Sequence, residues 1–184
     1  MPADSASTPL VASAALRVAW APDAAIVNLR GDPGDPAFVA AASQAIGMPL
    51  PLAAGDCPSS GDLRVLWAGP DDWFVLGPAG TEHALAARLR TAAAGRHRAV
   101  TDVSSGYRVL RVAGPGARDL LAQGCPLDMH PRAFALGRCA GSHFFKASIW
   151  VWRTGEDAFE LLVRSSFAGY VETLVHRCTL ESGR

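Results

Sequence analysis

The pattern of apolar residues in this chain repeats at a distance of 85 residues. Shifted by that distance, Trp67 coincides with Trp152, Asp72 with Asp157, Phe74 with Phe159, Leu76 with Leu161 and Leu89 with Leu174. Around each set the pattern predicts two short strands followed by a helix. Because each such element has an apolar face to bury, we expect two similar strand-strand-helix units packed as one α+β domain with a largely antiparallel sheet.

Local signals place the expected elements of the first half. Alanine content and apolar spacing predict a helix that Gly47 ends, and Thr81 is a candidate N-cap for a second helix that Gly95 ends. Residues 48–62 are rich in Pro, Gly and Ser and are expected to be a loop. The expected strands are 25–29, 63–69 and 73–78, and the expected helices are 37–46 and 82–94.

The second half follows the same order. Ser165 or Ser166 is expected to cap the last helix, in which Tyr170, Leu174 and Cys178 recur at four-residue spacing. The other expected elements are strands over 99–105, 107–114, 147–153 and 158–164 and a short helix over 116–123.

The length of 184 residues is enough for a self-sufficient core. We expect a disordered leader over 1–15 and a single domain over 16–180 with pseudo-duplicated halves of about 16–95 and 99–180. The leader has neither a basic segment nor a continuous apolar one, so it does not read as a signal peptide, and we expect a cytoplasmic protein.

Charge and hydropathy narrow the classes of partner. The 17 basic and 17 acidic residues give a formal net charge of zero, which disfavours nucleic acid and anionic membrane surfaces as partners. The hydrophobic fraction is 49%, yet no apolar run approaches the ~20 residues of a membrane span. A surface that a protein partner covers would reconcile these properties.

One segment gathers residue types that bind zinc. Cys125, His130, Cys139 and His143 lie within twenty residues, but they are spaced Cys-x4-His and Cys-x3-His without a CxxC knuckle. We therefore expect no metal site, with both cysteines buried and both histidines on a loop surface. All four cysteines of the chain are expected to be free thiols, although one disulfide pair stays open.

Two other motifs allow chemistry but favour structure. Gly114 and Gly116 precede a helix, but the third glycine of a dinucleotide site and the Gly-Lys-Ser/Thr of a phosphate loop are missing, so a tight turn is expected. Asp102 in "TDVSS" could be a general base if burial raised its pKa, but such an aspartate more often caps a turn. We assign no catalytic, cofactor-binding or metal-binding residue.

Tryptophan is dense in the expected strands. Trp67, Trp73, Trp150 and Trp152 all lie in expected hairpins. Trp150 and Trp152 lie two residues apart, so a strand would place these two on one face. Core packing explains such a face, and an interface anchor is the alternative.

Several motifs occur together in an order that resembles a known family. They are "GPDDW", "DVSS", "GP-x-A-x-x-x-L", "GCPLD-x-HP-x-x-F-x-x-G-x-C" and "RSSFA-x-Y". In this combination, from about Leu63 to about Cys178, the chain resembles the gamma subunit of heterotetrameric sarcosine oxidase. That family is related to the folate-binding domain of the aminomethyltransferase of glycine cleavage, which implies that domain's fold here.

The resemblance also implies partners and cofactors. It implies alpha, beta and delta subunits, with FAD, NAD and the folate-binding region on alpha, FMN on beta and zinc on delta, and no cofactor on this chain. Where the aminomethyltransferase has an acidic residue, "KASIWVWR" has Trp150 and Val151 after Ile149. This departure predicts a fold that has lost its folate chemistry.

The sequence thus predicts a non-catalytic structural subunit of a sarcosine oxidase complex. Such a complex would demethylate sarcosine oxidatively to glycine, with hydrogen peroxide and a one-carbon unit for tetrahydrofolate as the other products. A stand-alone folate-binding aminomethyltransferase-like protein is the alternative, and a small-ligand or metal-binding module is a third hypothesis.

Overall fold

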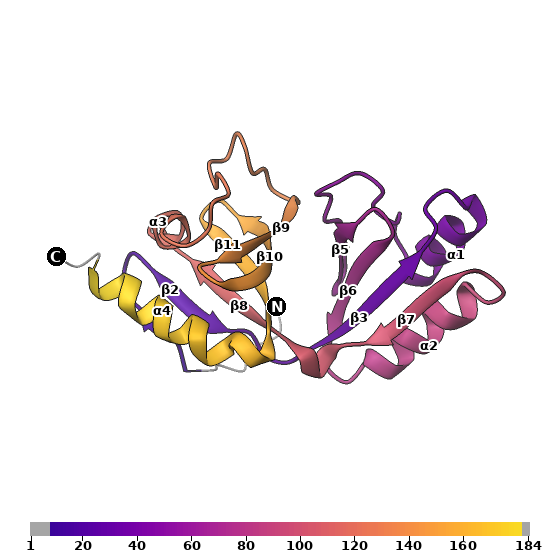
Figure 1. The fold of residues 1–184 in the computed structure, drawn as a ribbon, viewed down its shortest axis with the longest axis horizontal. Coiled ribbons are helices and arrows are strands. Elements are labelled where there is room, and N and C mark those ends of the chain that lie inside the picture. Colours follow the sequence, from indigo (N-terminus) through magenta and orange to yellow (C-terminus); the bar gives the residue numbers. More distant parts are fainter. Residues whose placement is uncertain (1–7, 182–184) are drawn as a thin grey trace. The chain divides into compact units, whose positions relative to one another are not determined.

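The computed structural model describes residues 8–181, which divide into two compact units whose elements are labelled in Figure 1. Unit 1 contains the chain up to Pro22, Ser105–Leu136 and the chain from Gly141 onward, and unit 2 contains Asp23–Ser104 and Gly137–Ala140. The first seven residues of the expected leader lie outside the described residues. The rest of the leader includes the short strand β1 (Val11–Ala12). That the units form one domain stays a prediction.

Unit 2 is built on a five-stranded sheet in the order β4-β5-β6-β3-β7. All four pairings in it are antiparallel. Val27 and Leu29 of β3 lie opposite Val75 and Trp73 of β6, so these four side chains share one face. The strands are β3 (Ala24–Gly31), β4 (Ser59–Ser60), β5 (Leu63–Gly69), β6 (Asp72–Pro78) and β7 (Arg98–Asp102).

The helices α1 (Pro36–Ile46) and α2 (Glu82–Ala92) bury their apolar sides in the same core as that face. The predicted start and stop of α1 are confirmed to within one residue: the Asp35 carboxylate accepts from the Ala37 amide, and Gly47 adopts φ 73°. For α2 the prediction was less accurate. The Thr81 hydroxyl donates to the Pro78 carbonyl instead of capping the helix, and the helix ends two residues early.

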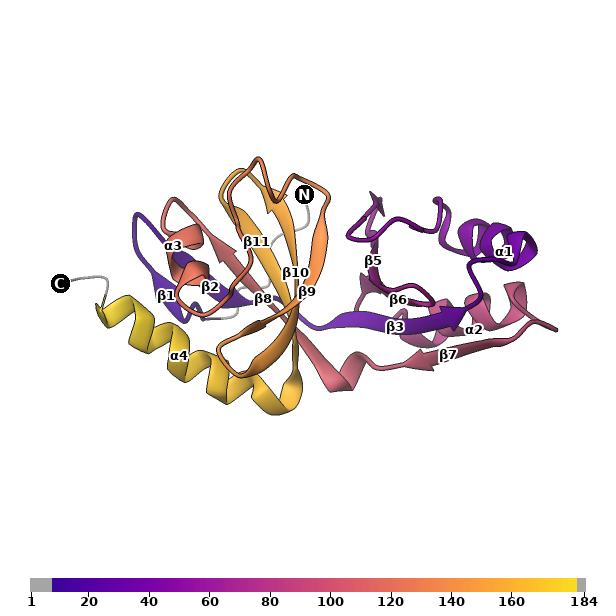
Figure 2. The ribbon, with the colours of Figure 1, turned by 45° about the horizontal axis from the view of Figure 1, so that its top comes forward.

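Unit 1 is built on a six-stranded sheet in the order β1-β2-β8-β11-β10-β9. Trp20 of β2 donates its indole N–H to Glu172 of α4 at 2.6 Å, which holds α4 against this sheet (Figure 2). The elements are β2 (Arg17–Trp20), β8 (Tyr107–Ala113), α3 (Ala117–Ala122), β9 (Cys139–Phe144), β10 (Ala147–Gly155), β11 (Ala158–Arg164) and α4 (Ala168–Glu181).

The two sheets share one topology, as the repeat predicts. In each sheet a hairpin (β5–β6 or β10–β11) has a shorter strand on one side (β4 or β9). On its other side lies the strand that opens the repeat (β3 or β8). Both hairpins have an irregularity near the end of their first strand, at Trp67/Gly69 and at Arg153/Gly155. In unit 2 the neighbour of β3 is β7, which follows the other strands of its sheet in sequence. In unit 1 the corresponding neighbour of β8 is β2, which precedes β8 in sequence. The predicted α+β fold of two similar, largely antiparallel units is confirmed.

Three features of unit 1 differ from the sequence prediction. Strands β2 and β9 were not predicted, because β2 lies next to the expected leader and β9 ("CAGSHF") has no β-branched residue. Ser165–Phe167 forms a 3₁₀ turn before the last helix. In that helix Leu174 and Cys178 are buried, whereas Tyr170 is 37% exposed and packs edge-on against Phe167.

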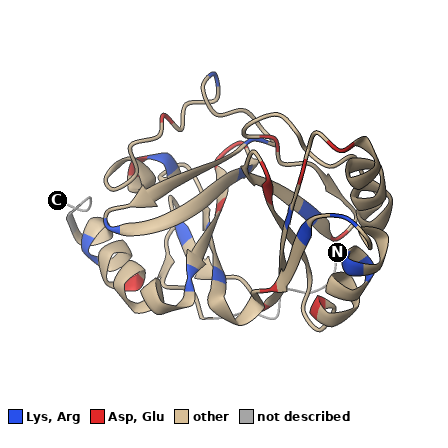
Figure 3. Ribbon diagram, turned by 45° about the vertical axis from the view of Figure 1, so that its right-hand side comes forward, with Lys and Arg blue, Asp and Glu red and all other residues tan. Residues whose placement is uncertain are grey.

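Charged residues of both signs occur on the helices and strands of both units (Figure 3). Several are paired locally, as in Arg30 with Asp71 and Arg111 with Glu160. Within residues 8–181, no helix is long and apolar enough to cross a membrane.

Candidate functional site

The four residues of the zinc-like segment are not brought together. Cys125 is buried, with its thiol 3.5 Å from the Ser142 hydroxyl, and Cys139 is buried in unit 2. His130 is exposed, and its Nδ1 accepts from the Arg132 amide at 3.2 Å. His143 is also exposed, but it lies on strand β9 and not on a loop. The predicted burial of the cysteines is confirmed. Across the described part of the chain, no group of three or more His, Cys, Asp or Glu side chains is placed to hold a metal ion.

Asp102 is a turn-capping residue, as its interpretation from sequence favoured. Its Oδ1 accepts from the Ser104 hydroxyl at 2.6 Å and from the Ser104 amide at 3.0 Å. These two hydrogen bonds lower the pKa of Asp102, and His83 at 4.0 Å adds a smaller effect in the same direction. The Ser104 hydroxyl oxygen also accepts from the Ile26 amide. A carboxylate that acts as a general base at neutral pH requires a raised pKa, and the pKa of Asp102 is lowered. The hydrogen bonds of Asp102 instead stabilise the turn.

The glycines of "AGPGA" form the predicted strand-to-helix turn. Gly114 adopts φ 111°, and a Cβ at this position would lie 2.5 Å from the carbonyl oxygen of Ala15. Gly116 donates its amide to the same carbonyl oxygen at 2.9 Å. The two glycines therefore allow the chain to pass close to residues 13–16, which explains the motif without a ligand.

The tryptophans Trp150 and Trp152 share a face of β10, as predicted. Trp152 is buried and donates its indole N–H to Glu160 Oε2 at 2.9 Å, while Arg111 donates to Glu160 Oε1 at 3.0 Å. Trp150 lies opposite Leu162 and is half-buried. Trp152 therefore belongs to the packed interior with its polar edge satisfied.

The most distinctive feature of unit 2 is a contact between segments far apart in sequence. Gly137–Ala140, which we call the clasp, pairs with residues 55–57: the Cys57 amide donates to the Gly137 carbonyl at 3.0 Å and the Cys139 amide to the Gly55 carbonyl at 2.8 Å. Residues 56 and 58 in turn accept from β5. The clasp thus pairs with residues 55–57 through an isolated bridge between Asp56 and Arg138 and covers backbone groups next to β5 that would otherwise be open.

Charge and backbone shape fix the clasp. Arg138 forms an ion pair with Asp56, and its second nitrogen donates to the Ala54 carbonyl at 2.7 Å. Gly55 adopts φ 81°, and a Cβ there would lie 2.8 Å from the Arg138 guanidinium and 3.0 Å from the Cys139 carbonyl oxygen. Only glycine fits this approach without displacing the clasp.

Two buried thiols meet where the clasp contacts residues 55–57. The Cys139 thiol lies 3.4 Å from the carbonyl oxygen of Asp56 and 3.6 Å from that of Trp67 and can donate its one proton to either, while Cys57 accepts from Arg64 at 3.6 Å. A hydrogen bond with Cys57, reinforced by burial, raises the pKa of Cys139 far above its ordinary value. Among the described residues, neither cysteine forms a disulfide. Because the thiolate is the reactive form, Cys139 is unsuited to nucleophilic chemistry.

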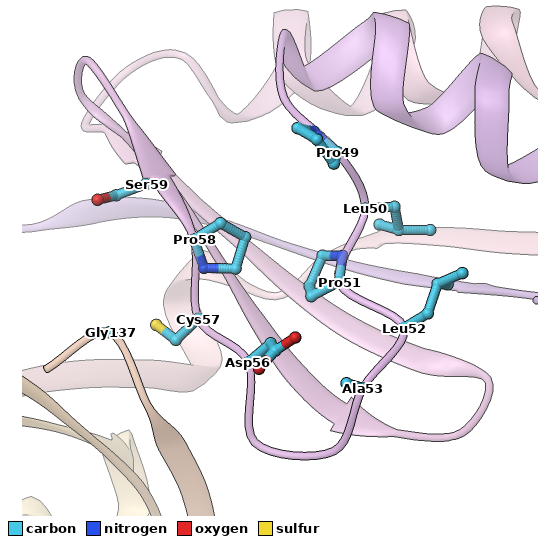
Figure 4. Close-up of a pocket in the computed structure, with 10 residues that line it drawn as sticks. All are labelled: Pro49, Leu50, Pro51, Leu52, Ala53, Asp56, Cys57, Pro58, Ser59 and Gly137. Carbon is cyan, nitrogen blue, oxygen red and sulfur yellow. The ribbon is translucent and has the colours of Figure 1, made fainter. Parts of the chain in front are cut away.

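Next to the clasp lies an open cavity of about 650 Å³, which we call the proline hollow (Figure 4). The rings of Pro51 and Pro58 lie on opposite sides of it, and the Ser59 hydroxyl points away from the rings. Leu52, at 50% exposure, is among the most exposed large apolar residues that the structure describes. The lining residues are Pro49, Leu50, Pro51, Leu52, Ala53, Asp56, Cys57, Pro58, Ser59 and Gly137.

Polar groups around the proline hollow are engaged within unit 2. The carbonyl of Pro51 accepts from the Trp73 indole at 2.7 Å, and the Asp56 carboxylate is neutralised by Arg138. Three further lining carbonyls, those of Ala53, Pro58 and Gly137, accept backbone amides. The hollow can therefore offer apolar contact but few free donors or acceptors to orient a polar ligand.

Sequence reasoning treated the residues of the proline hollow only as a loop. Their Pro/Gly/Ser content correctly excluded a helix, but nothing local indicates pairing with a segment eighty residues away. Cys139 lies near His130 and His143 in the sequence, whereas Cys57, which it contacts in the structure, is far away along the chain. The signal in the sequence is the presence of the apolar residues Leu50 and Leu52 within a segment that is otherwise typical of a loop.

Comparison with known proteins agrees with this geometry. The fold is shared with aminomethyltransferase T of the glycine cleavage system from Bartonella henselae, at a TM-score of 0.64 and 16% identity, over 88% of this chain and 45% of that one. This likeness defines the class of fold. The model of the sarcosine oxidase gamma subunit family matches residues 30–180, and the chain belongs to that family.

Individual relatives give the same result. Sarcosine oxidase subunit gamma from Corynebacterium sp. (strain P-1) is 37% identical, and that from Arthrobacter sp. is 35% identical, each over 142 residues that make up 77% of this chain and 68% of the relative. Among solved structures, the heterotetrameric sarcosine oxidase from Corynebacterium sp. U-96 in complex with pyrrole 2-carboxylate contains a chain that matches with a TM-score of 0.86 and 29% identity. The match covers 94% of this chain and 88% of that one.

Proposed function

We propose that this chain is a structural subunit of a heterotetrameric sarcosine oxidase and carries no catalytic residue of its own. The observation that carries the proposal is its membership of the gamma-subunit family together with the TM-score of 0.86 to a chain of the heterotetrameric enzyme. In the proposed reaction the assembly oxidises the N-methyl group of sarcosine, yields glycine and hydrogen peroxide, and passes the one-carbon unit to tetrahydrofolate.

The proposed partners are the alpha, beta and delta subunits, in the cytoplasm. In this proposal the FAD, NAD, FMN, tetrahydrofolate and zinc sites lie on those chains. The zero net charge of this chain supports protein partners over nucleic acid or a membrane surface.

The chemistry of the candidate groups supports a structural role. The pKa of Asp102 is lowered by Ser104 and that of Cys139 is raised by Cys57, so neither is tuned for base or nucleophile chemistry at neutral pH. The resemblance to the aminomethyltransferase pattern implies a carboxylate after Ile149, where β10 of this chain has Trp150 and Val151. These residues support a fold that is retained for packing.

The test is to assemble the oxidase with and without this chain. The other three subunits are co-expressed alone or with it, and the products are compared by size-exclusion chromatography and by peroxide release from sarcosine. We expect the full-size assembly to be lost and turnover to fall by about tenfold or more without this chain, as when a buried interface is removed. Normal assembly and turnover without it would refute the proposal. The isolated chain, assayed alone, serves as the control and should release no peroxide.

A further inference from the structure

We propose that the proline hollow is the binding site for an extended segment of another oxidase subunit, which inserts large apolar side chains into it. The inference rests on the proposed function, because it requires that other subunits be present. It names a surface of unit 2 that neither the family match nor the relatives' names assign to any contact.

The shape of the hollow favours a polypeptide over a small ligand. Small-molecule sites enclose most of their ligand and orient it with a few free polar groups. Here Leu52 is half exposed at the rim, and the carbonyls of Pro51 and Pro58 are already hydrogen-bonded within unit 2. A volume of about 650 Å³ accommodates more than one side chain. An open, apolar concavity of this kind suits one part of a larger surface.

Charge decides which macromolecule fits. Among the described residues that line the hollow, Asp56 alone is charged, and the Arg138 guanidinium neutralises it. The lining therefore offers neither the basic residues that phosphate groups require nor those that anionic lipid headgroups require. An apolar segment matches this neutral surface and gains from leaving water.

The walls of the hollow are fixed before any partner arrives. Proline at positions 49, 51 and 58 restricts the backbone, the Trp73 indole holds the Pro51 carbonyl, and the clasp closes one side at Gly137. A preformed surface loses little conformational entropy on binding, so its apolar contacts contribute more fully to affinity.

Two pairs of variants test the proposal in the assembled oxidase. Leu52→Asp places a charge at the rim, and Leu180→Asp is its control because Leu180 is also exposed but lies on α4 of unit 1. Ala53→Trp fills the hollow, and Ala79→Trp is its control because Ala79 is exposed in the same unit and does not line the hollow. Each variant is tagged, co-expressed with the other subunits and purified, and the flavin absorbance recovered per tagged chain is measured. A thermal melt of each tagged chain checks folding.

We expect Leu52→Asp and Ala53→Trp to reduce recovered flavin by about tenfold or more, and both controls to stay within about twofold of the unaltered chain. Wild-type recovery with Leu52→Asp and Ala53→Trp would overturn the inference and leave the proposed function intact, as would equal losses in all four variants. If Leu52→Asp does not fold, Ala53→Trp decides. An unaltered chain that recovers no flavin would overturn both proposals. Self-association of the isolated chain that Leu52→Asp abolishes would assign the hollow to a second copy and also overturn the inference.

Discussion

Each unit contains one long irregular segment, and the two segments are held by different chemistry. In unit 1, residues 123–136 are anchored at Phe134 by Arg153, the one buried charged side chain among the described residues. Its guanidinium donates to the carbonyls of Phe134, Gly155 and Glu156 at 3.1, 2.9 and 2.9 Å. In unit 2, the anchors of Leu50 and Pro51 are neutral: the Ser43 hydroxyl accepts from the Leu50 amide at 2.9 Å, and the Trp73 indole donates to the Pro51 carbonyl at 2.7 Å. The charged anchor of this segment, Arg138, contacts Ala54 and Asp56 and is 44% exposed, so it is not a buried charge like Arg153.

The difference shows how two units can share one sheet topology and present different surfaces. A buried guanidinium must have its donors satisfied, so Arg153 draws carbonyl groups inward and fills the space around itself. Neutral anchors need fewer partners and leave room for the apolar walls of the proline hollow. The two units therefore share a strand order but differ in the surfaces that they expose.

The strongest test of the comparison removes the charged anchor. Arg153→Met is expected to lower the free energy of unfolding by about 3 kcal/mol, because it leaves the carbonyl of the buried Phe134 and the carbonyl of the half-buried Gly155 without this donor. Arg111→Met is the control: Arg111 is about half exposed in its ion pair with Glu160, and its loss should cost at most about 1 kcal/mol. Urea unfolding of both variants measures the difference. Equal losses would show that the buried arginine has no special role in unit 1.

The neutral anchor of unit 2 can be tested with two tryptophans that face each other in the β5–β6 pairing. Trp73→Phe removes the donor to the Pro51 carbonyl and should cost about 2 kcal/mol. Trp67 lies directly opposite Trp73, and its indole nitrogen is buried with no acceptor in the described structure. Trp67→Phe loses no hydrogen bond and is expected to cost clearly less in the same urea titration. A larger loss from Trp67→Phe would mean that ring size, and not the hydrogen bond, holds the segment.

The smallest expected effect is a pH dependence that belongs to the clasp. The folded state raises the pKa of Cys139, so the stability that its neutral thiol contributes is complete below the ordinary value of 9.0 and declines as pH rises above it. We expect the unaltered chain to lose about 1.4 kcal/mol per pH unit more than Cys139→Ala above that value. Unfolding curves at a series of alkaline pH values measure both slopes. Parallel slopes would contradict the buried, hydrogen-bonded state of this thiol.

The sequence predicted most of the elements that local signals define. Helix α1 was found because Gly47 ends it and alanines fill it, and strand β11 was predicted with its observed bounds because apolar residues dominate Ala158–Arg164. Strand β9 was missed, since its Gly, Ser and His residues carry little strand preference and its pairing partner comes later in the chain.

The candidate site was harder to predict because it depends on contacts distant in sequence. The proline hollow exists only because Gly137 and Arg138 meet residues 54–57, and no local pattern encodes that pairing. The interpretation of Asp102 succeeded for the opposite reason, since its partner Ser104 is two residues away.

The central claim, that the chain works as one subunit of a flavin-containing oxidase, is tested most directly by purifying the tagged protein from its native cells. The co-purifying chains are identified and the visible absorption of the eluate is recorded. The account predicts a yellow eluate with one large, one medium and one very small partner chain. A colourless protein that elutes alone would contradict the account. Folate binding and metal binding by the isolated chain would then be the functions to measure.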